Sequence, residues 1–81
     1  MNKEQLAEYV SQGREIEFQY KGKKYSITYG RIDGKDVISF CEFYKDSTEV
    51  VTVDELLDVE REGVTVLQML ESVADCDVWI L

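Results

Sequence analysis

The sequence contains no histidine and no proline, and only two of its 81 residues are cysteines. Without histidine, the chain has no Ser-His-Asp or Cys-His catalytic group and no zinc site that uses imidazole. Two cysteines are too few for a tetrahedral zinc site made of thiolates alone. Glycine-rich phosphate-binding motifs are also absent. These absences predict a protein that is not an enzyme and that holds no metal or cofactor.

Long apolar runs are missing as well. The longest are a few residues, far short of the roughly 20 residues that cross a bilayer, and the charged first residues are followed by no apolar signal region. We therefore expect a cytoplasmic protein that makes no contact with a membrane. In that compartment Cys41 and Cys76 are expected to be reduced thiols that pack as small hydrophobic residues.

The length predicts a single domain, residues 1–81, with one core and little room for a deep cleft. Hydrophobic residues make up 44% of the chain, which argues against disorder despite the high charge.

The first segment has the features of a helix. Asn2 and Gln5 have the spacing of an N-terminal capping box, and Gly13 is suited to end the helix in a left-handed conformation. Apolar residues recur between them at helical spacing, namely Leu6, Tyr9 and Val10.

The clearest pattern is a β-hairpin over residues 16–29. Apolar and polar residues alternate on both sides of a Lys-Gly turn at residues 21–22. This turn pairs Phe18 with Tyr25 and places the apolar side chains on one face. A slip of one residue would move them all to the other face, so the turn and the pattern support the same register.

A second turn, Asp33-Gly34, adds a third strand and pairs Ile27 with Phe40. The prediction is a three-stranded antiparallel meander over roughly residues 14–44.

Two short helices are expected after the meander. Residues 52–55 and 65–68 each have the form of a capping box, and the first helix should end before Gly63. These helices should pack on the apolar face of the sheet. The apolar residues 78–81 form either a fourth strand or a docked tail. The predicted fold class is therefore α+β.

Charge is unevenly distributed along the chain. Residues 46–81 contain ten acids and one base, Arg61, whereas the first 45 residues contain eight bases and seven acids. The net charge of −8 therefore comes from the second half of the chain. This balance disfavours direct binding to nucleic acid or to an anionic membrane, and it makes a basic protein surface the expected partner.

The candidate binding residues are five carboxylates in one short segment: Asp54, Glu55, Asp58, Glu60 and Glu62. On a helix that lasted long enough, Asp58 would neighbour both Asp54 and Glu62, and such like-charged neighbours are mildly destabilising. One interpretation is a solvated face that keeps the protein soluble, and another is a binding face for a basic protein. A calcium site is disfavoured because the acids lack EF-hand spacing.

The stretch from Arg14 to Phe43 resembles small uncharacterised proteins of phages and mobile elements in Gram-positive bacteria. The resemblance is carried by residues 16–27, by residues 38–44 and by the later segments 53–57 and 63–67. It transfers no site residues, because these are structural patterns. It implies a genomic setting in which small acidic proteins inhibit host defence nucleases, as anti-CRISPR proteins do.

Together these observations predict a non-enzymatic inhibitor whose carboxylates block the basic, nucleic-acid-binding groove of such a nuclease. The alternative is a small assembly module, for example a homodimer, that self-associates through a sheet edge or through residues 78–81 and whose acids serve solubility alone. A small hydrolase that uses a carboxylate pair is the third hypothesis.

Overall fold

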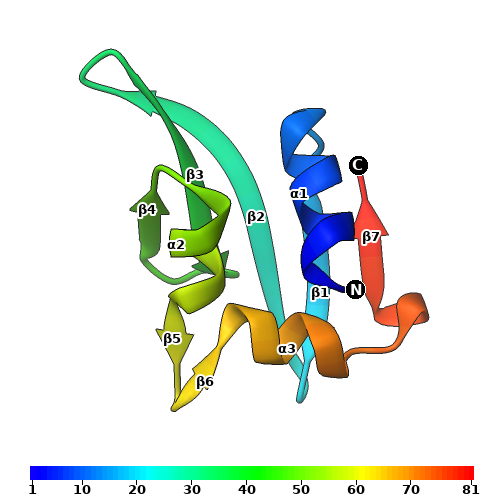
Figure 1. Cartoon of the computed structure of the whole chain (residues 1–81). Coiled ribbons are helices and arrows are strands. Elements are labelled where there is room, and N and C mark those ends of the chain that lie inside the picture. The colour runs from blue at the N-terminus through cyan, green and yellow to red at the C-terminus, as the bar shows by residue number, and fades with distance from the viewer.

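A computed structural model describes all 81 residues, and it confirms the α+β class. Three α-helices lie over one face of a five-stranded antiparallel sheet with strand order β4-β3-β2-β1-β7 (Figure 1). A separate two-stranded hairpin, β5-β6, follows the second helix. In chain order the elements are α1 (Lys3–Ser11), β1 (Ile16–Tyr20), β2 (Lys23–Ile32), β3 (Lys35–Glu42), β4 (Ser47–Val50), α2 (Val53–Asp58), β5 (Glu60–Arg61), β6 (Val64–Thr65), α3 (Val66–Ser72), the 3₁₀ helix η1 (Asp75–Asp77) and β7 (Val78–Ile80).

The predicted capping boxes are present at all three helices. At α1, the Asn2 side chain accepts a hydrogen bond from the Gln5 amide (2.8 Å), and the Gln5 side chain accepts one from the Asn2 amide (3.0 Å). The same reciprocal pattern joins Thr52 to Glu55 and Thr65 to Gln68. Each box satisfies amides that the first helical turn leaves without partners.

The predicted meander is confirmed in register. Phe18 lies opposite Tyr25, and Ile27 lies opposite Phe40. Both turns have positive φ at their two central residues, with values of 49° and 79° at residues 21–22 and of 51° and 79° at residues 33–34. This conformation matches the twist of the flanking strands, which is why these turns hold the register.

The sheet has more strands than the three predicted. β4 pairs with β3, with Val50 opposite Ile38, but its sequence Ser-Thr-Glu-Val is too short and too polar to stand out as a strand. A third tight turn at Glu62-Gly63, with φ of 55° and 79°, joins β5 to β6. Each of these two strands has only two residues, so neither has an alternating pattern to detect.

The open choice for the C-terminal segment is resolved in favour of a strand. β7 pairs with β1 and places Trp79 opposite Glu17 and Ile80 opposite Ile16. β7 therefore forms one edge of the sheet and β4 forms the other. Both chain ends lie beside the β7 edge (Figure 1).

The core lies between the sheet and the helices. An aromatic stack of Phe18, Tyr25 and Phe40, with ring centroids 5.4–6.2 Å apart, forms its centre. Twelve residues are buried and none of them is charged. They are Leu6, Ile16, Phe18, Tyr25, Ile27, Ile38, Phe40, Leu56, Leu57, Val66, Met69 and Leu70. No helix of the structure combines the length and the apolar character that a bilayer crossing requires.

Candidate protein-binding surface

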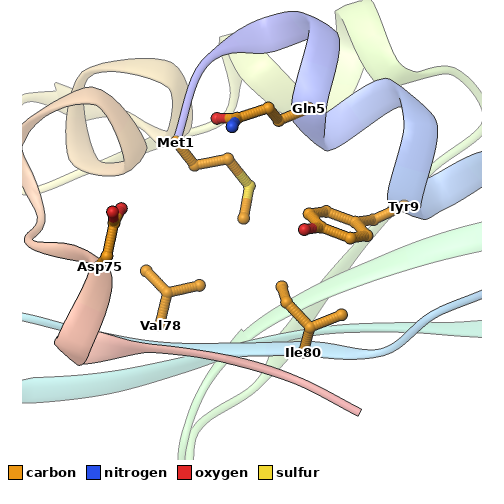
Figure 2. A pocket seen from close by; sticks show the side chains of 6 residues that line it. All are labelled: Met1, Gln5, Tyr9, Asp75, Val78 and Ile80. Carbon is orange, nitrogen blue, oxygen red and sulfur yellow. The ribbon is translucent and has the colours of Figure 1, made fainter.

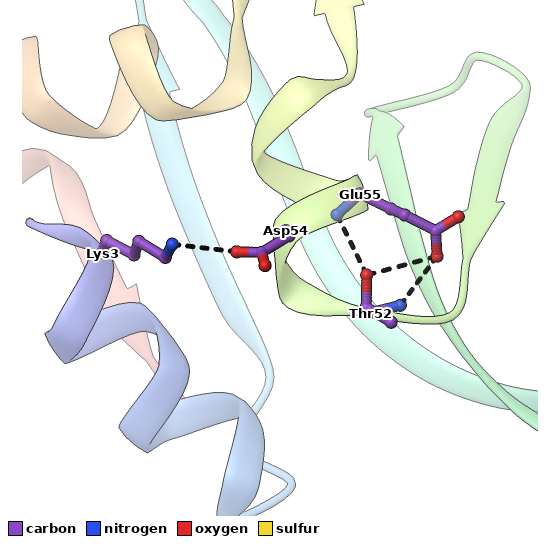
Figure 3. A network of polar contacts seen from close by, with 4 residues as sticks. All are labelled: Lys3, Thr52, Asp54 and Glu55. Carbon is purple, nitrogen blue, oxygen red and sulfur yellow. Dashed lines mark hydrogen bonds and ion pairs between the residues drawn. The ribbon is translucent and has the colours of Figure 1, made fainter.

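The five candidate carboxylates lie on α2 and on the β5–β6 hairpin, and they do not form one uniform face. Asp54, near the start of α2, forms an ion pair with Lys3 of α1 (2.9 Å), and both side chains are exposed. Figure 3 shows Asp54 directed towards α1 and Glu55 directed to the opposite side of α2. Consecutive acids therefore point apart, because successive helical residues are about 100° apart around the axis.

Glu55 is held by the start of its own helix. Its carboxylate accepts hydrogen bonds from the amides of Val51 (3.1 Å) and Thr52 (3.0 Å), and the Thr52 hydroxyl lies 3.3 Å away (Figure 3). These backbone hydrogen bonds lower the pKa of Glu55 below its usual value, because they stabilise the ionised form. Glu55 therefore stays negatively charged while it caps α2.

Glu62 occupies the turn between β5 and β6 and forms an ion pair with Lys23 at the start of β2. The hydrogen bond from Lys23 lowers the pKa of Glu62, and the same bond raises the pKa of Lys23. Both groups are exposed to solvent, so the pair is screened by water and salt.

Asp58 and Glu60 are exposed and form no ion pair. Asp58 is the last residue of α2, and Glu60 begins β5. α2 does not last long enough for Asp58 and Glu62 to be helical neighbours, because the chain leaves the helix at Val59, which has extended backbone angles. Of the five acids, only Asp54 and Asp58 share a helix at i, i+4 spacing.

Arg61, the single base of the second half of the chain, does not neutralise an acid. Its guanidinium lies 5.5 Å from the centre of the Phe40 ring and donates hydrogen bonds to the Thr48 hydroxyl and to the Glu60 carbonyl. It links the β5–β6 hairpin to β4 and to the core. The negative charge of residues 46–81 is therefore left without a local base apart from the exposed pairs with Lys3 and Lys23.

The structure also shows a division of charge that sequence position alone conceals. The three α-helices carry six exposed acids and one base, whereas the strands of the large sheet carry four acids and four bases. The helical acids are Glu4, Glu8, Asp54, Glu55, Asp58 and Glu71, and the base is Lys3. Glu4, Glu8 and Glu71 were not among the candidates, because the sequence does not reveal that α1, α2 and α3 share one face of the sheet.

The structure brings together no group of three or more cysteine, aspartate or glutamate side chains that could hold a metal ion. Cys41 and Cys76 are free thiols. Cys41 is half-buried and its thiol lies 2.9 Å from the Glu42 carbonyl. Cys76 is exposed, so the prediction that it packs as a small hydrophobic residue is wrong. Cys76 is the middle residue of η1.

A scan against models of known protein families finds no match, and searches of curated proteins and of solved structures find no significant match.

Proposed function

We propose that this chain is a non-enzymatic protein-binding domain that uses the acids of its helices and of the β5–β6 hairpin to hold a basic protein surface. One observation carries the proposal. The net negative charge is concentrated on α1, α2 and α3, whereas the large sheet is electrically balanced. A field of one sign on one side of a small protein attracts and orients a partner of the opposite sign.

The ion pairs of this surface support the proposal. Asp54 pairs with Lys3 and Glu62 pairs with Lys23; Asp54, Lys3 and Glu62 are largely solvent-exposed, and Lys23 is partly exposed. Exposed pairs contribute little to stability, so the carboxylates can exchange these lysines for a partner's Lys or Arg at small cost. Asp58 and Glu60 need no such exchange, and no base offsets the charge of Glu55, because its hydrogen bonds come only from uncharged groups.

The partner we favour is a protein whose Lys- and Arg-rich groove normally binds nucleic acid. Such grooves are built to hold a row of phosphates, and binding releases counterions. Carboxylates on the three helices would compete for the same side chains. The chain would then act as an inhibitor by occupying the groove, in the manner of an anti-CRISPR protein that mimics nucleic acid.

The test is affinity capture from a bacterial host lysate with wild type and with a variant in which all five candidate acids are neutralised. The substitutions are Asp54→Asn, Glu55→Gln, Asp58→Asn, Glu60→Gln and Glu62→Gln. Glutamine keeps the capping box at α2, because it also serves at that position. A purified partner is then tested for loss of its own nucleic-acid binding when the chain is added.

The proposal predicts that the wild type retains a nucleic-acid-binding protein at low salt and releases it at high salt, and that the variant does not retain it. A partner that binds both proteins equally well, or that keeps its nucleic acid bound in the presence of the wild type, would count against the proposal.

The second candidate, a self-associating assembly module, is favoured by one observation. β7 is an unprotected sheet edge with the sequence Val-Trp-Ile, and Trp79 is 41% exposed. The charge of −8 on each copy opposes self-association. Sedimentation velocity at increasing protein and salt concentration separates the two functions, since a homodimer strengthens with salt whereas binding to a basic partner weakens.

A further inference from the structure

The outer edge of β7 offers backbone groups to a further strand. The Leu81 amide donates to the Glu15 carbonyl of the neighbouring chain segment (2.8 Å), so odd-numbered residues of this segment face β1. In an antiparallel ladder, the even-numbered residues then face away from β1. The amide and carbonyl of Ile80 and the carbonyl of Val78 therefore point to the free edge, whereas the Val78 amide bonds to Asp75.

A pocket of about 230 Å³ adjoins the same edge, between α1 and β7, and four hydrophobic and two polar residues line it. Val78 and Ile80 point into it from the strand, and Met1 and Tyr9 approach from the side of α1 (Figure 2). These four side chains are only half-buried. The pocket is smaller than the sites of about 300–1,000 Å³ that hold drug-sized molecules, but it has room for a side chain.

The charged groups at the pocket indicate which kind of segment would bind there. Asp75 lies at one end, beside Val78, and the Gln5 amide and the Tyr9 hydroxyl are the other polar side-chain groups at the pocket (Figure 2). Asp77 follows in the same 3₁₀ helix, and no basic side chain lines the pocket. The N-terminal ammonium of Met1 donates to the Leu70 carbonyl (2.9 Å) and forms no ion pair with Asp75. A second copy of β7 has the sequence Val-Trp-Ile and brings no base to Asp75, and each copy carries a charge of −8. A basic segment of another protein fits better.

We propose that the groove between α1 and β7 binds an extended, basic segment of a partner protein as an added strand. In antiparallel pairing, the residue opposite Ile80 exchanges two backbone hydrogen bonds with it and directs its side chain into the pocket, beside Val78 and Ile80. The residue two positions later lies opposite Val78 and directs its side chain towards Asp75. The recognised pattern is an apolar residue, any residue, and then Lys or Arg.

This site is separate from the surface in the proposed function. The five carboxylates tested for that surface are exposed on α2 and on the β5–β6 hairpin, whereas the groove is lined by α1, η1 and the sheet edge. Neutralising Asp54, Glu55, Asp58, Glu60 and Glu62 should therefore leave binding in the groove unchanged within about twofold. Failure of one proposal leaves the other standing.

The probe is the peptide Gly-Ser-Thr-Val-Thr-Leu-Thr-Lys-Ser-Gly, in which Leu and Lys have the required spacing. Titration calorimetry measures its affinity, and amide shifts in nitrogen-15 NMR spectra locate it. A second peptide carries N-methyl leucine and lacks the amide that would donate to Ile80. A third has Glu in place of Lys. The protein variants are Asp75→Lys and the five-fold neutral protein, each checked for folding by its NMR spectrum.

We expect the first peptide to shift the amides of β7 and α1, and the N-methyl and Glu peptides to bind at least about fivefold more weakly. Asp75→Lys should reverse the preference, so that the Glu peptide binds more tightly than the Lys peptide. If Asp75→Lys does not fold, the affinities of the three peptides for the wild-type protein still test the proposal.

Equal binding of the N-methyl peptide, or no binding of the Lys peptide, would overturn the proposal. So would a homodimer in sedimentation that dissociates when Ile80 is replaced by Glu, because a second copy would then occupy the edge.

Discussion

The helices and the large sheet of this protein share one core but differ in the charge they expose. The helices carry six acids and one base, and the strands carry four of each. Both layers need the same kind of apolar side chains on their inner faces, so the difference lies only in residues that packing leaves free. Charge in these positions does not specify the fold, and it is available for recognition and solubility.

The largest loss of stability should come from the core between the helices and the large sheet. Phe40→Ala removes a fully buried ring that stacks on Phe18 and Tyr25 and lies under Arg61, and it should cost about 3–5 kcal/mol of unfolding free energy. Phe43→Ala, at a half-buried ring that follows β3 and does not pack against the core, should cost about 1 kcal/mol. Urea denaturation measures both. Equal costs would mean that the core does not lie where we place it.

Substitution of two glycines compares the β5–β6 hairpin with the large sheet. Gly63 has a φ of +79°, so Gly63→Ala forces a left-handed conformation on alanine and should cost about 1–2 kcal/mol. Gly30 lies in β2, and a Cβ there would be 4.0 Å from the nearest Val37 atom. Gly30→Ala should therefore be neutral or stabilising by up to about 1 kcal/mol. Thermal denaturation measures the stability of both variants. Equal losses of stability would contradict the left-handed conformation of Gly63 in the β5–β6 turn.

Two charge variants with the same net charge test the comparison directly. Glu4→Gln with Glu71→Gln removes two acids from the helices, and Glu17→Gln with Glu49→Gln removes two from the sheet. Against a basic partner, we expect the first variant to lose about three- to tenfold in affinity at low salt and the second to lose less than twofold. Equal losses in titration calorimetry would show that only the total charge matters.

The smallest effect concerns pH. The pKa of Glu55 is lower in the folded chain than in the unfolded chain, so its contribution to stability is present above the unfolded value near pH 4.3 and is lost as pH falls through the folded value. The stability difference between wild type and Glu55→Gln should therefore change below about pH 4.5 and be constant above about pH 6. Urea midpoints measured from pH 3 to pH 7 check this. A constant difference over that range would mean that the backbone hydrogen bonds do not shift Glu55.

The sequence predicted those parts of the fold that rest on local patterns. The three capping boxes and the registers of both long hairpins depend on residues at most a few positions from a turn or a helix start. β4, β5 and β6 were missed because strands of two to four residues have no detectable period.

The candidate site was predicted less completely. The five acids were found, but the positions of Lys3 and Lys23, which pair with Asp54 and Glu62, depend on tertiary packing. The same packing brings Glu4, Glu8 and Glu71 to the side of the sheet that carries α2. No short segment of sequence contains that information.

The pairing of β7 with β1 also has a consequence for the order of folding. The three tight turns close hairpins within a few residues, whereas Arg14 and Leu81 meet across 67 positions of the chain. Closing a long loop costs more entropy than closing a short one, and chains fold more slowly as their contacts become more distant in sequence. We expect the meander to form first and β7 to dock last. Pulsed hydrogen exchange during refolding would then protect the amide of Tyr25 before that of Leu81, and the docking site of the last strand on β1 would be open while the chain is still emerging from the ribosome.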